Sequence, residues 1–309
     1  MININCNICG KDNTDILLNG HDRYMSVDNT SYTLVKCKNC GLVYISPQPT
    51  LSELGKYYPT DYPPYVTDYK VFSDSKFIRF AKKIYSLFKN KKAEPIINKK
   101  TEQDQSSKKV LDFGCGRGHL LLALQKQHPN WELYGFDIAT NQEVKNIGHN
   151  IHIHLDDFSR MEENFEAKSF DLIYLNNVLE HVHDPKDIIN RLSHILKDDG
   201  EIVIEIPNID AFKFKLFGKN FSSLDIPRHL YHFSPDTIEK LCKKCNMNIT
   251  EIKFAGTTKS TVLSLYYFLG IKNRQLNPII FNILQRLTKL IGKDKIDNDS
   301  MIIKAKKIL

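Results

Sequence analysis

Short apolar runs alternate with amphipathic stretches along the chain from Lys108 onward. The runs have the length of strands, and the stretches between them carry apolar residues at helical spacing. Strands that alternate with helices predict a parallel sheet covered by helices, which is an α/β fold. The predicted strands are 110–113, 133–137, 151–155, 170–177 and 201–208.

The first third of the chain has a weaker pattern. Residues 32–36 alternate like a strand, and residues 57–65 form a run of tyrosine and proline that predicts an extended loop, for binding or for packing. Residues 77–88 predict an amphipathic helix, and the polar residues 89–109 predict a linker. We therefore expect three regions: residues 1–50, residues 51–107 and residues 108–309, the last with a helical insertion near 263–292.

Two Cys-x-x-Cys pairs, each followed by glycine, lie near the N-terminus. Four thiolates in two pairs match the tetrahedral coordination of a structural zinc ion, and they leave no open position for catalysis. We expect a zinc ribbon over residues 1–50, whereas free surface cysteines are the alternative. A third pair, Cys242 and Cys245, is predicted to pack within a helix. The candidate zinc ligands are Cys6, Cys9, Cys37 and Cys40.

Charge and composition exclude few classes of function. The net charge of +7 is compatible with nucleic acid or a membrane surface. The basic residues form no stripe interleaved with aromatic residues, so we expect no nucleic-acid partner. Residues 1–10 lack the basic and apolar segments of a signal peptide, and we expect a cytoplasmic protein with reduced cysteines.

The turn after the first predicted strand, residues 114–118, has the pattern Gly-x-Gly-x-Gly. Its glycines allow close approach to a ligand, and the helix that begins at His119 presents N–H groups to an anionic group. A glycine turn alone also fits a purely structural role. Asp112 precedes the turn, and Asp137 ends the next strand at a position that suits a ribose diol. The two acids favour cofactor binding.

The segment from Asp112 to Gly118 resembles motif I of the class I S-adenosylmethionine-dependent methyltransferases. The stretches FDLIYLNNVLEHVHDP, DDGEIVIEIPN and PRHLYHFSP follow in order. With the CNICG and CKNCG knuckles, they make the chain similar to zinc-ribbon-bearing methyltransferases associated with sugar and polysaccharide modification. The resemblance implies a Rossmann-like seven-stranded methyltransferase sheet with an N-terminal zinc-ribbon appendage. Residues 299–306 would form its last, antiparallel strand.

S-adenosylmethionine is therefore the expected cofactor, beside structural Zn²⁺. Asp157 follows the third strand, where it would accept a hydrogen bond from the adenine amino group; an exposed acidic turn is the alternative. The candidate cofactor-binding residues are Asp112, Gly114, Cys115, Gly116, Gly118, Asp137, Ile138, Asp157, Phe158 and Asn176.

His229 is the first candidate general base, because an imidazole titrates near neutral pH. The alternative for this residue is a hydrogen bond that stabilises the loop. The sugar C-methyltransferases that the chain resembles place a base histidine in a Glu-His pair. Here Arg228 precedes His229, and Ile226 stands where those enzymes have a tyrosine. O-methylation and C-methylation both stay open, and Arg228 is a candidate contact for a substrate phosphate or carboxylate.

Tyr62 and His181 are the other candidate catalytic residues, and a structural role or a place at the edge of the cofactor is the alternative for His181. Glu180 and His181 resemble a pair that is linked to a divalent ion in quinone O-methyltransferases. Those enzymes have an acid where Asn177 stands here. We therefore expect no catalytic metal.

The expected function is methyl transfer from S-adenosylmethionine to an oxygen or carbon atom of a nucleotide sugar or glycan precursor. One alternative is an O-methyltransferase of a small aromatic or quinone-like acceptor, and another is a non-catalytic module that binds the cofactor. Residues 263–292 carry apolar groups at helical spacing with Lys and Arg between them. Packing on the core or in a homodimer is the first expectation for this segment, and peripheral membrane contact is the alternative.

Overall fold

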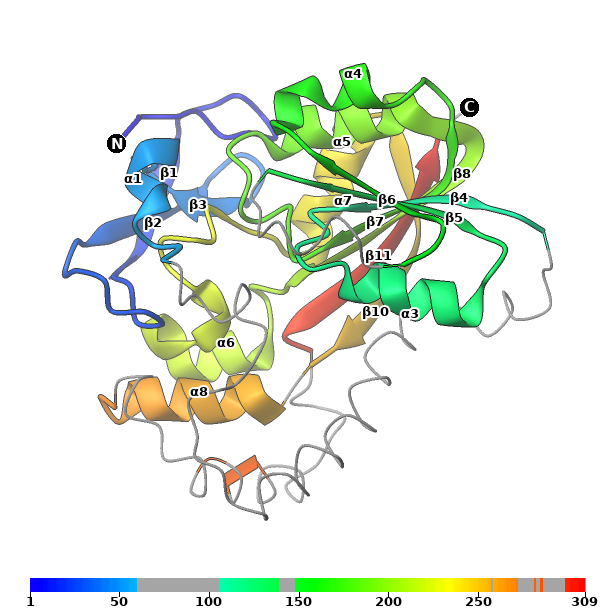
Figure 1. The fold of residues 1–309 in the computed structure, drawn as a ribbon. Coiled ribbons are helices and arrows are strands. Elements are labelled where there is room, and N and C mark those ends of the chain that lie inside the picture. The colour runs from blue at the N-terminus through cyan, green and yellow to red at the C-terminus, as the bar shows by residue number, and fades with distance from the viewer. Residues whose placement is uncertain are drawn as a thin grey trace, which may run out of the picture. The chain divides into compact units, whose positions relative to one another are not determined.

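The computed structural model describes most of the chain (Figure 1). Tyr62, the predicted helix 77–88 and nearly all of the predicted linker lie outside the described residues. By their contacts, residues Met1–Pro59, Asn177–Ser193 and Ile204–Leu309 form one compact unit, and Thr60–Asn176 with His194–Val203 form the other. The described residues are 1–59, 106–138, 148–256, 258–271, 281, 284–285 and 298–308.

A seven-stranded sheet has the strand order β10-β11-β8-β7-β4-β5-β6, which confirms the predicted Rossmann-like α/β fold. Strand β4 pairs in parallel with β5 and β7, β5 pairs in parallel with β6, and β10 runs antiparallel to β11. The strands are β4 (Lys109–Phe113), β5 (Glu132–Asp137), β6 (Ile151–Leu155), β7 (Phe170–Asn176), β8 (Leu196–Pro207), β10 (Met247–Ala255) and β11 (Ser300–Lys307).

Strand β8 begins earlier than its sequence suggests. The predicted strand begins at residue 201, but α5 (Pro185–Ile195) ends earlier and β8 already includes Asp198-Asp199-Gly200. Lys197 pairs with Asp171 at 2.7 Å, and Asp198 pairs with Lys168 at 2.8 Å. These ion pairs let a polar segment continue the strand, because its charges find partners on the neighbouring strand β7 and just before it.

The glycine turn leads from β4 into α3 (His119–Gln127), as predicted (Figure 1). Leu121 and Leu124 are the buried residues of this helix. Gly135 on β5 makes room for α3, because an added Cβ would lie 2.9 Å from the Leu121 side chain. A 3₁₀ turn η4 (Phe158–Arg160) and α4 (Met161–Asn164) follow β6.

A second sheet, with the order β1-β2-β3-β9, belongs to the other unit. Its last strand comes from far along the chain: Tyr231 lies opposite Tyr44, and His232 lies opposite Val43. The segment that carries His229 is therefore attached to the N-terminal sheet by backbone pairing. The strands are β1 (Thr14–Gly20), β2 (Tyr32–Cys37), β3 (Val43–Ile45) and β9 (Tyr231–His232).

Short helices complete this unit. Thr50 caps α1 and Ser234 caps α7, each through a capping box, and Cys242 and Cys245 are buried at the end of α7. The described part of the predicted insertion is mainly α8, which buries Val262 and other residues. No helix within the described ranges is long and apolar enough to span a bilayer. The helices are α1 (Leu51–Gly55), α6 (Phe212–Phe217), η5 (Gly218–Asn220), η6 (Ser222–Leu224), α7 (Pro235–Lys244) and α8 (Thr258–Phe268).

Candidate functional site

The glycine turn is built from left-handed backbone. Gly114, Gly116 and Gly118 have φ of 74°, 50° and 67°, a region that side chains with a Cβ adopt rarely. The N–H of Gly114 donates to the carbonyl of Phe136 at 2.7 Å, which ties the turn to the end of β5. A Cβ built on Gly116 would meet no atom within 4 Å, so this face of the turn is open. A ligand can approach the backbone here.

Two acids flank the turn. The carboxylate of Asp137 accepts a hydrogen bond from the Gly116 N–H at 2.7 Å. Asp112 is buried, and burial together with the charge of Asp137 raises its pKa to about 7. A cationic ligand would relieve the repulsion between the two carboxylates. The amino and sulfonium groups of S-adenosylmethionine are cationic, so these residues fit that cofactor better than they fit a diphosphate.

Cys115 turns its side chain toward the sheet. An added Cβ at Gly135 would lie 2.8 Å from the Cys115 sulfur, and burial raises the pKa of the thiol. The N–H of Cys115 donates to Phe136 at 3.2 Å. The thiol therefore packs between elements, and cofactor contact by Cys115 stays a prediction.

The remaining candidate cofactor residues lie at the ends of strands. Ile138 is 53% exposed directly after Asp137, and the ring of Phe158 lies 4.5 Å from that of Phe113 at the end of β4. Asn176 is the exposed last residue of β7. Exposed apolar groups at the carboxyl ends of parallel strands are suited to an adenine ring.

Asp157 has a structural partner. Its carboxylate caps η4 by accepting from the Ser159 N–H at 2.8 Å, and the hydrogen bonds from Ser159 lower its pKa. This geometry matches the exposed acidic turn that was the alternative for this residue, and adenine recognition by Asp157 stays a prediction.

The four N-terminal cysteines come together in one cluster. Their sulfur atoms all lie within 4.8 Å of one another, with 3.3 Å between Cys6 and Cys40 and 3.5 Å between Cys9 and Cys37. Zinc–sulfur bonds of about 2.3 Å at tetrahedral angles place two sulfurs about 3.8 Å apart. The spacing and the donor set therefore fit one zinc ion.

A second cluster joins Glu180, His181 and His229, whose candidate ligand atoms also lie within 4.8 Å of one another. The Nδ1 atom of His229 lies 2.9 Å from the carbonyl oxygen of Ser223. A carbonyl can only accept, so this bond places the proton on Nδ1 and leaves the lone pair on Nε2. That Nε2 atom is 3.9 Å from a carboxylate oxygen of Glu180 and 3.9 Å from one of Asp225.

The cluster is strongly desolvated. Burial, followed by the neighbouring His181 and His232, holds the pKa of His229 well below its ordinary value. Burial raises the pKa of Glu180 to about 8. Among the described residues, neither carboxyl oxygen of Glu180 has a hydrogen-bond partner. At neutral pH this arrangement holds a neutral imidazole beside a largely protonated carboxyl group.

His181 links this cluster to the described start of the tyrosine-rich loop. Its Nδ1 atom lies 3.1 Å from the hydroxyl of Tyr58 and 3.0 Å from the carbonyl oxygen of Arg228. Tyr57 is fully buried, and its hydroxyl donates to Asp28 at 2.8 Å. This part of the loop packs, which was one of the two expected roles, and it contacts a candidate catalytic residue. Substrate binding by the loop stays a prediction.

Arg228 does not offer its guanidinium to a substrate, contrary to expectation. The side chain is fully buried, and it donates to both oxygens of Asp225 at 3.1 Å, to Asp22 at 2.7 Å and to the carbonyl of Tyr57 at 3.2 Å. These bonds clamp the loop of His229 to the N-terminal region. Asp22 and Asp225 were not singled out in the sequence, although Asp225 stands three residues before Arg228 and four before His229.

Comparisons with known proteins give a consistent picture. A family model described as "Methyltransferase domain" matches residues 85–252, more than half of the chain. A ubiquinone biosynthesis O-methyltransferase of Actinobacillus pleuropneumoniae serotype 7 is 29% identical over 161 residues, which cover 47% of this chain and 68% of that protein. The mitochondrial counterpart of Dictyostelium discoideum is 28% identical over 164 residues, 47% of this chain and 51% of that one. A solved structure of a SAM-dependent methyltransferase from Archaeoglobus fulgidus is 18% identical to this chain and aligns with a TM-score of 0.49. The alignment covers 75% of this chain and 100% of that one.

Proposed function

We propose that this chain, which belongs to the methyltransferase domain family, is an O-methyltransferase whose general base is His229. The broader activity, methyl transfer from S-adenosylmethionine, follows from the family. The observation that carries the finer proposal is the tautomer of His229. Its Nδ1–H is committed to Ser223, and its basic Nε2 atom faces two carboxyl groups.

Asp112, Asp137 and the glycine turn would hold the cofactor. S-adenosylmethionine supplies a methyl group that its sulfonium already activates. Asp137 would accept hydrogen bonds from the ribose, as an acid at the end of a second strand does in nucleotide-binding sheets. Asp112 would lie near the cationic methionine end, and ionisation of its carboxyl group would become easier there, since a nearby positive charge lowers a carboxyl pKa.

His229 would take the proton of the acceptor hydroxyl. The 3.9 Å between its Nε2 atom and Glu180 is too long for a hydrogen bond. A hydroxyl oxygen bonded to both groups at about 2.8 Å would fit this separation with roughly a right angle between the bonds. A low imidazole pKa keeps Nε2 unprotonated at neutral pH, so the base is available without a preceding deprotonation.

A phenolic hydroxyl on a small quinone-like ring is the first acceptor class. The similar proteins named ubiquinone biosynthesis O-methyltransferases support it, and they support oxygen rather than carbon as the methylated atom. A nucleotide sugar or glycan precursor is the second class. A cationic pocket close to His229, described below, favours it.

Zinc would be structural in this protein. The four sulfur atoms of the N-terminal cluster would fill its coordination sphere, and the metal would hold together the two knuckles beside the small sheet.

A catalytic metal is a separate possibility that a chelation experiment addresses. Glu180, His181 and His229 offer two imidazoles and a carboxylate, which can hold a divalent ion. We expect turnover to survive brief treatment with EDTA under conditions that leave zinc bound. Loss of turnover that Mg²⁺ or Mn²⁺ restores would instead give His229 a ligand role.

A labelled-methyl transfer assay tests the base directly. Asn at position 229 can still donate to the Ser223 carbonyl but lacks a basic nitrogen. We expect His229→Asn to lower kcat by roughly a hundredfold or more while the Kd of S-adenosylmethionine stays unchanged. His149→Asn, at an exposed position, is the matched control. The acceptors tested are catechols, hydroxylated quinols and nucleotide sugars. If the His229→Asn variant retains turnover, another group must be the base.

A further inference from the structure

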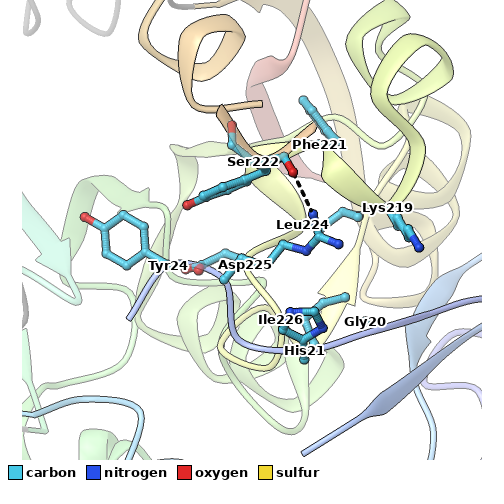
Figure 2. Close-up of a pocket in the computed structure, with 11 residues that line it drawn as sticks. Gly20, His21, Tyr24, Lys219, Phe221, Ser222, Leu224, Asp225 and Ile226 are labelled. Carbon is cyan, nitrogen blue, oxygen red and sulfur yellow. Dashed lines mark hydrogen bonds between the residues drawn. The ribbon is translucent and has the colours of Figure 1, made fainter. Parts of the chain in front are cut away.

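A pocket whose described residues carry a net positive charge lies beside the candidate base, in the same unit (Figure 2). It encloses about 290 Å³ of empty volume, part of it open to solvent. Its walls come from the segment after β1, from the turns η5 and η6, and from the end of α8. Figure 2 shows Tyr24 on one side and Lys219 on the opposite side. The enclosed part of this space is small, so it suits one functional group of an acceptor and not a whole ligand.

Arg23 supplies the main charge of this pocket. The guanidinium is half-buried, and it donates to the side-chain oxygen of Asn220 and to the carbonyl of Tyr267 at 3.5 Å. Both acceptors are neutral, and no carboxylate pairs with Arg23 among the described residues. A half-buried cation without a counter-charge is costly, so an anionic ligand would stabilise it.

Two further basic groups lie near Arg23. His21 and Lys219 both line the pocket. Burial, followed by the charges of Arg23 and Lys219, lowers the pKa of His21, whereas the charge of Asp22 opposes this shift. Three nitrogen groups around one small space suit a tetrahedral oxyanion, which presents acceptors in several directions, better than a planar carboxylate.

The acids at this place are already engaged. Asp225 lines the pocket, but Arg228 binds both of its carboxylate oxygens. Asp22 accepts from the same guanidinium and from the backbone N–H groups of Met25 and Val27 at 3.0 Å each. Arg228 neutralises one of these two acids. The two positive charges of Arg23 and Lys219 exceed the one that remains, so the described groups around the pocket keep a net positive charge for a ligand.

Asp225 also connects the pocket to the chemistry. One of its oxygens lies 3.9 Å from Nε2 of His229, so a group held in the pocket has the candidate base on the other side of a single side chain. We propose that this pocket binds a phosphate group carried by the acceptor, and that this contact directs the acceptor hydroxyl to His229. The inference rests on the proposed function, because it treats the phosphate as part of the methylated molecule.

Direct binding to the full, zinc-loaded chain tests the pocket without any methyl transfer. The probes are inorganic pyrophosphate, uridine diphosphate and the carboxylate 4-hydroxybenzoate, each titrated by calorimetry at low salt. We expect pyrophosphate to bind, and the double variant R23Q/K219A to bind it roughly tenfold to a hundredfold more weakly. Lys215→Ala removes an exposed lysine of α6 that does not line the pocket, and it should leave the Kd unchanged.

The outcomes separate the possible sources of the phosphate. Tighter binding of uridine diphosphate than of pyrophosphate supports a nucleotide-linked acceptor, and equal binding supports a phosphate on another carrier. The proposal is wrong if neither pyrophosphate nor uridine diphosphate binds. It is also wrong if 4-hydroxybenzoate binds as tightly as pyrophosphate and loses as much affinity when Arg23 is replaced.

The His229→Asn variant keeps the two proposals apart. It should bind pyrophosphate like the unmodified protein, because His229 does not line the pocket. If this variant loses turnover but the unmodified protein binds no phosphate, His229 stays the proposed general base and only the phosphate site is excluded.

Discussion

Two buried carboxyl groups dominate the electrostatics at the level of single residues. Asp112 and Glu180 are 3% and 1% exposed, and burial raises the pKa of the first to about 7 and of the second to about 8. In the proposed reaction, Asp112 would lie near the cationic end of the cofactor, and the carboxyl group of Glu180 lies near the neutral imidazole of His229. Their protonation therefore makes both stability and activity sensitive to pH near neutrality.

The first prediction concerns the pH dependence of stability. A carboxyl group whose pKa is raised from 4.5 to about 8 stabilises the folded state fully below pH 4.5 and loses this contribution as pH rises to about 8. Glu180→Gln should therefore flatten the fall in unfolding free energy between about pH 5 and 7.5, by roughly 1.4 kcal/mol per pH unit. Urea unfolding at several pH values measures the slope. The exposed Glu239→Gln should keep the original slope, and an unchanged slope in the Glu180 variant would contradict a raised pKa.

The second prediction concerns cofactor affinity. Asn at position 137 can still accept the Gly116 N–H, but it lacks the charge that would bind two ribose hydroxyls strongly. We expect Asp137→Asn to weaken binding of S-adenosylmethionine roughly tenfold to a hundredfold, since hydrogen bonds to charged groups contribute about 1.5–3 kcal/mol. Calorimetry gives the Kd. Asp199→Asn, at an exposed position of β8, is the control, and equal affinity in both variants would remove the ribose contact.

At the level of elements, the loop between η6 and β9 is fixed from two directions. Strand β9 pairs with β3, and Arg228 binds acids from two distant parts of the sequence. His229 lies between these two attachments. A base that must keep one nitrogen on Ser223 and the other toward an acceptor benefits from such a rigid support.

The third prediction tests this clamp. Replacing Arg228 by Met keeps much of the side-chain volume but leaves Asp22 and Asp225 without their cation. Removal of one partner from a buried ion pair typically costs about 3–5 kcal/mol, and we expect a loss of that order for Arg228→Met. Arg160→Met, which removes a 57% exposed side chain from its ion pairs, should cost about 0–1 kcal/mol. Similar unfolding midpoints for the two variants would show that the clamp contributes little.

Sequence patterns predicted local elements well and long-range contacts poorly. The glycine turn, α3, five strands of the large sheet and the capped start of α7 follow from periodicity and capping residues that lie close together in the chain. The pairing of β9 with β3 depends on backbone bonds between residues nearly 190 positions apart, and no local pattern encodes it. The same holds for Arg228, whose partner Asp22 gave no signal beyond its charge, and for the contact of His229 with Glu180.

At the level of the whole chain, the proposed roles fall on different compact units. The glycine turn, Asp112 and Asp137 belong to one unit, whereas the cysteine cluster, Glu180 and His229 belong to the other. Cofactor binding and acceptor activation should therefore respond separately to damage in one unit. Zinc offers a way to perturb only the second of them.

The last prediction follows from the path between the cysteine cluster and the base. Cys37 ends β2, Cys40 lies three residues before β3, and β3 pairs with β9, two residues after His229. Without zinc the four thiols lose the bonds that hold the two knuckles, and apparent zinc binding in such sites is worth about 10–16 kcal/mol. We expect Cys37→Ser or a strong chelator to release about one zinc per chain. Turnover should then fall at least tenfold, which corresponds to roughly 1.4 kcal/mol or more of activation free energy. The Kd of S-adenosylmethionine should stay unchanged. Cys242→Ser, outside the cluster, should keep its zinc. If cofactor affinity and turnover fall by the same factor, zinc supports the whole fold, because the cofactor site would then depend on zinc as much as the base does.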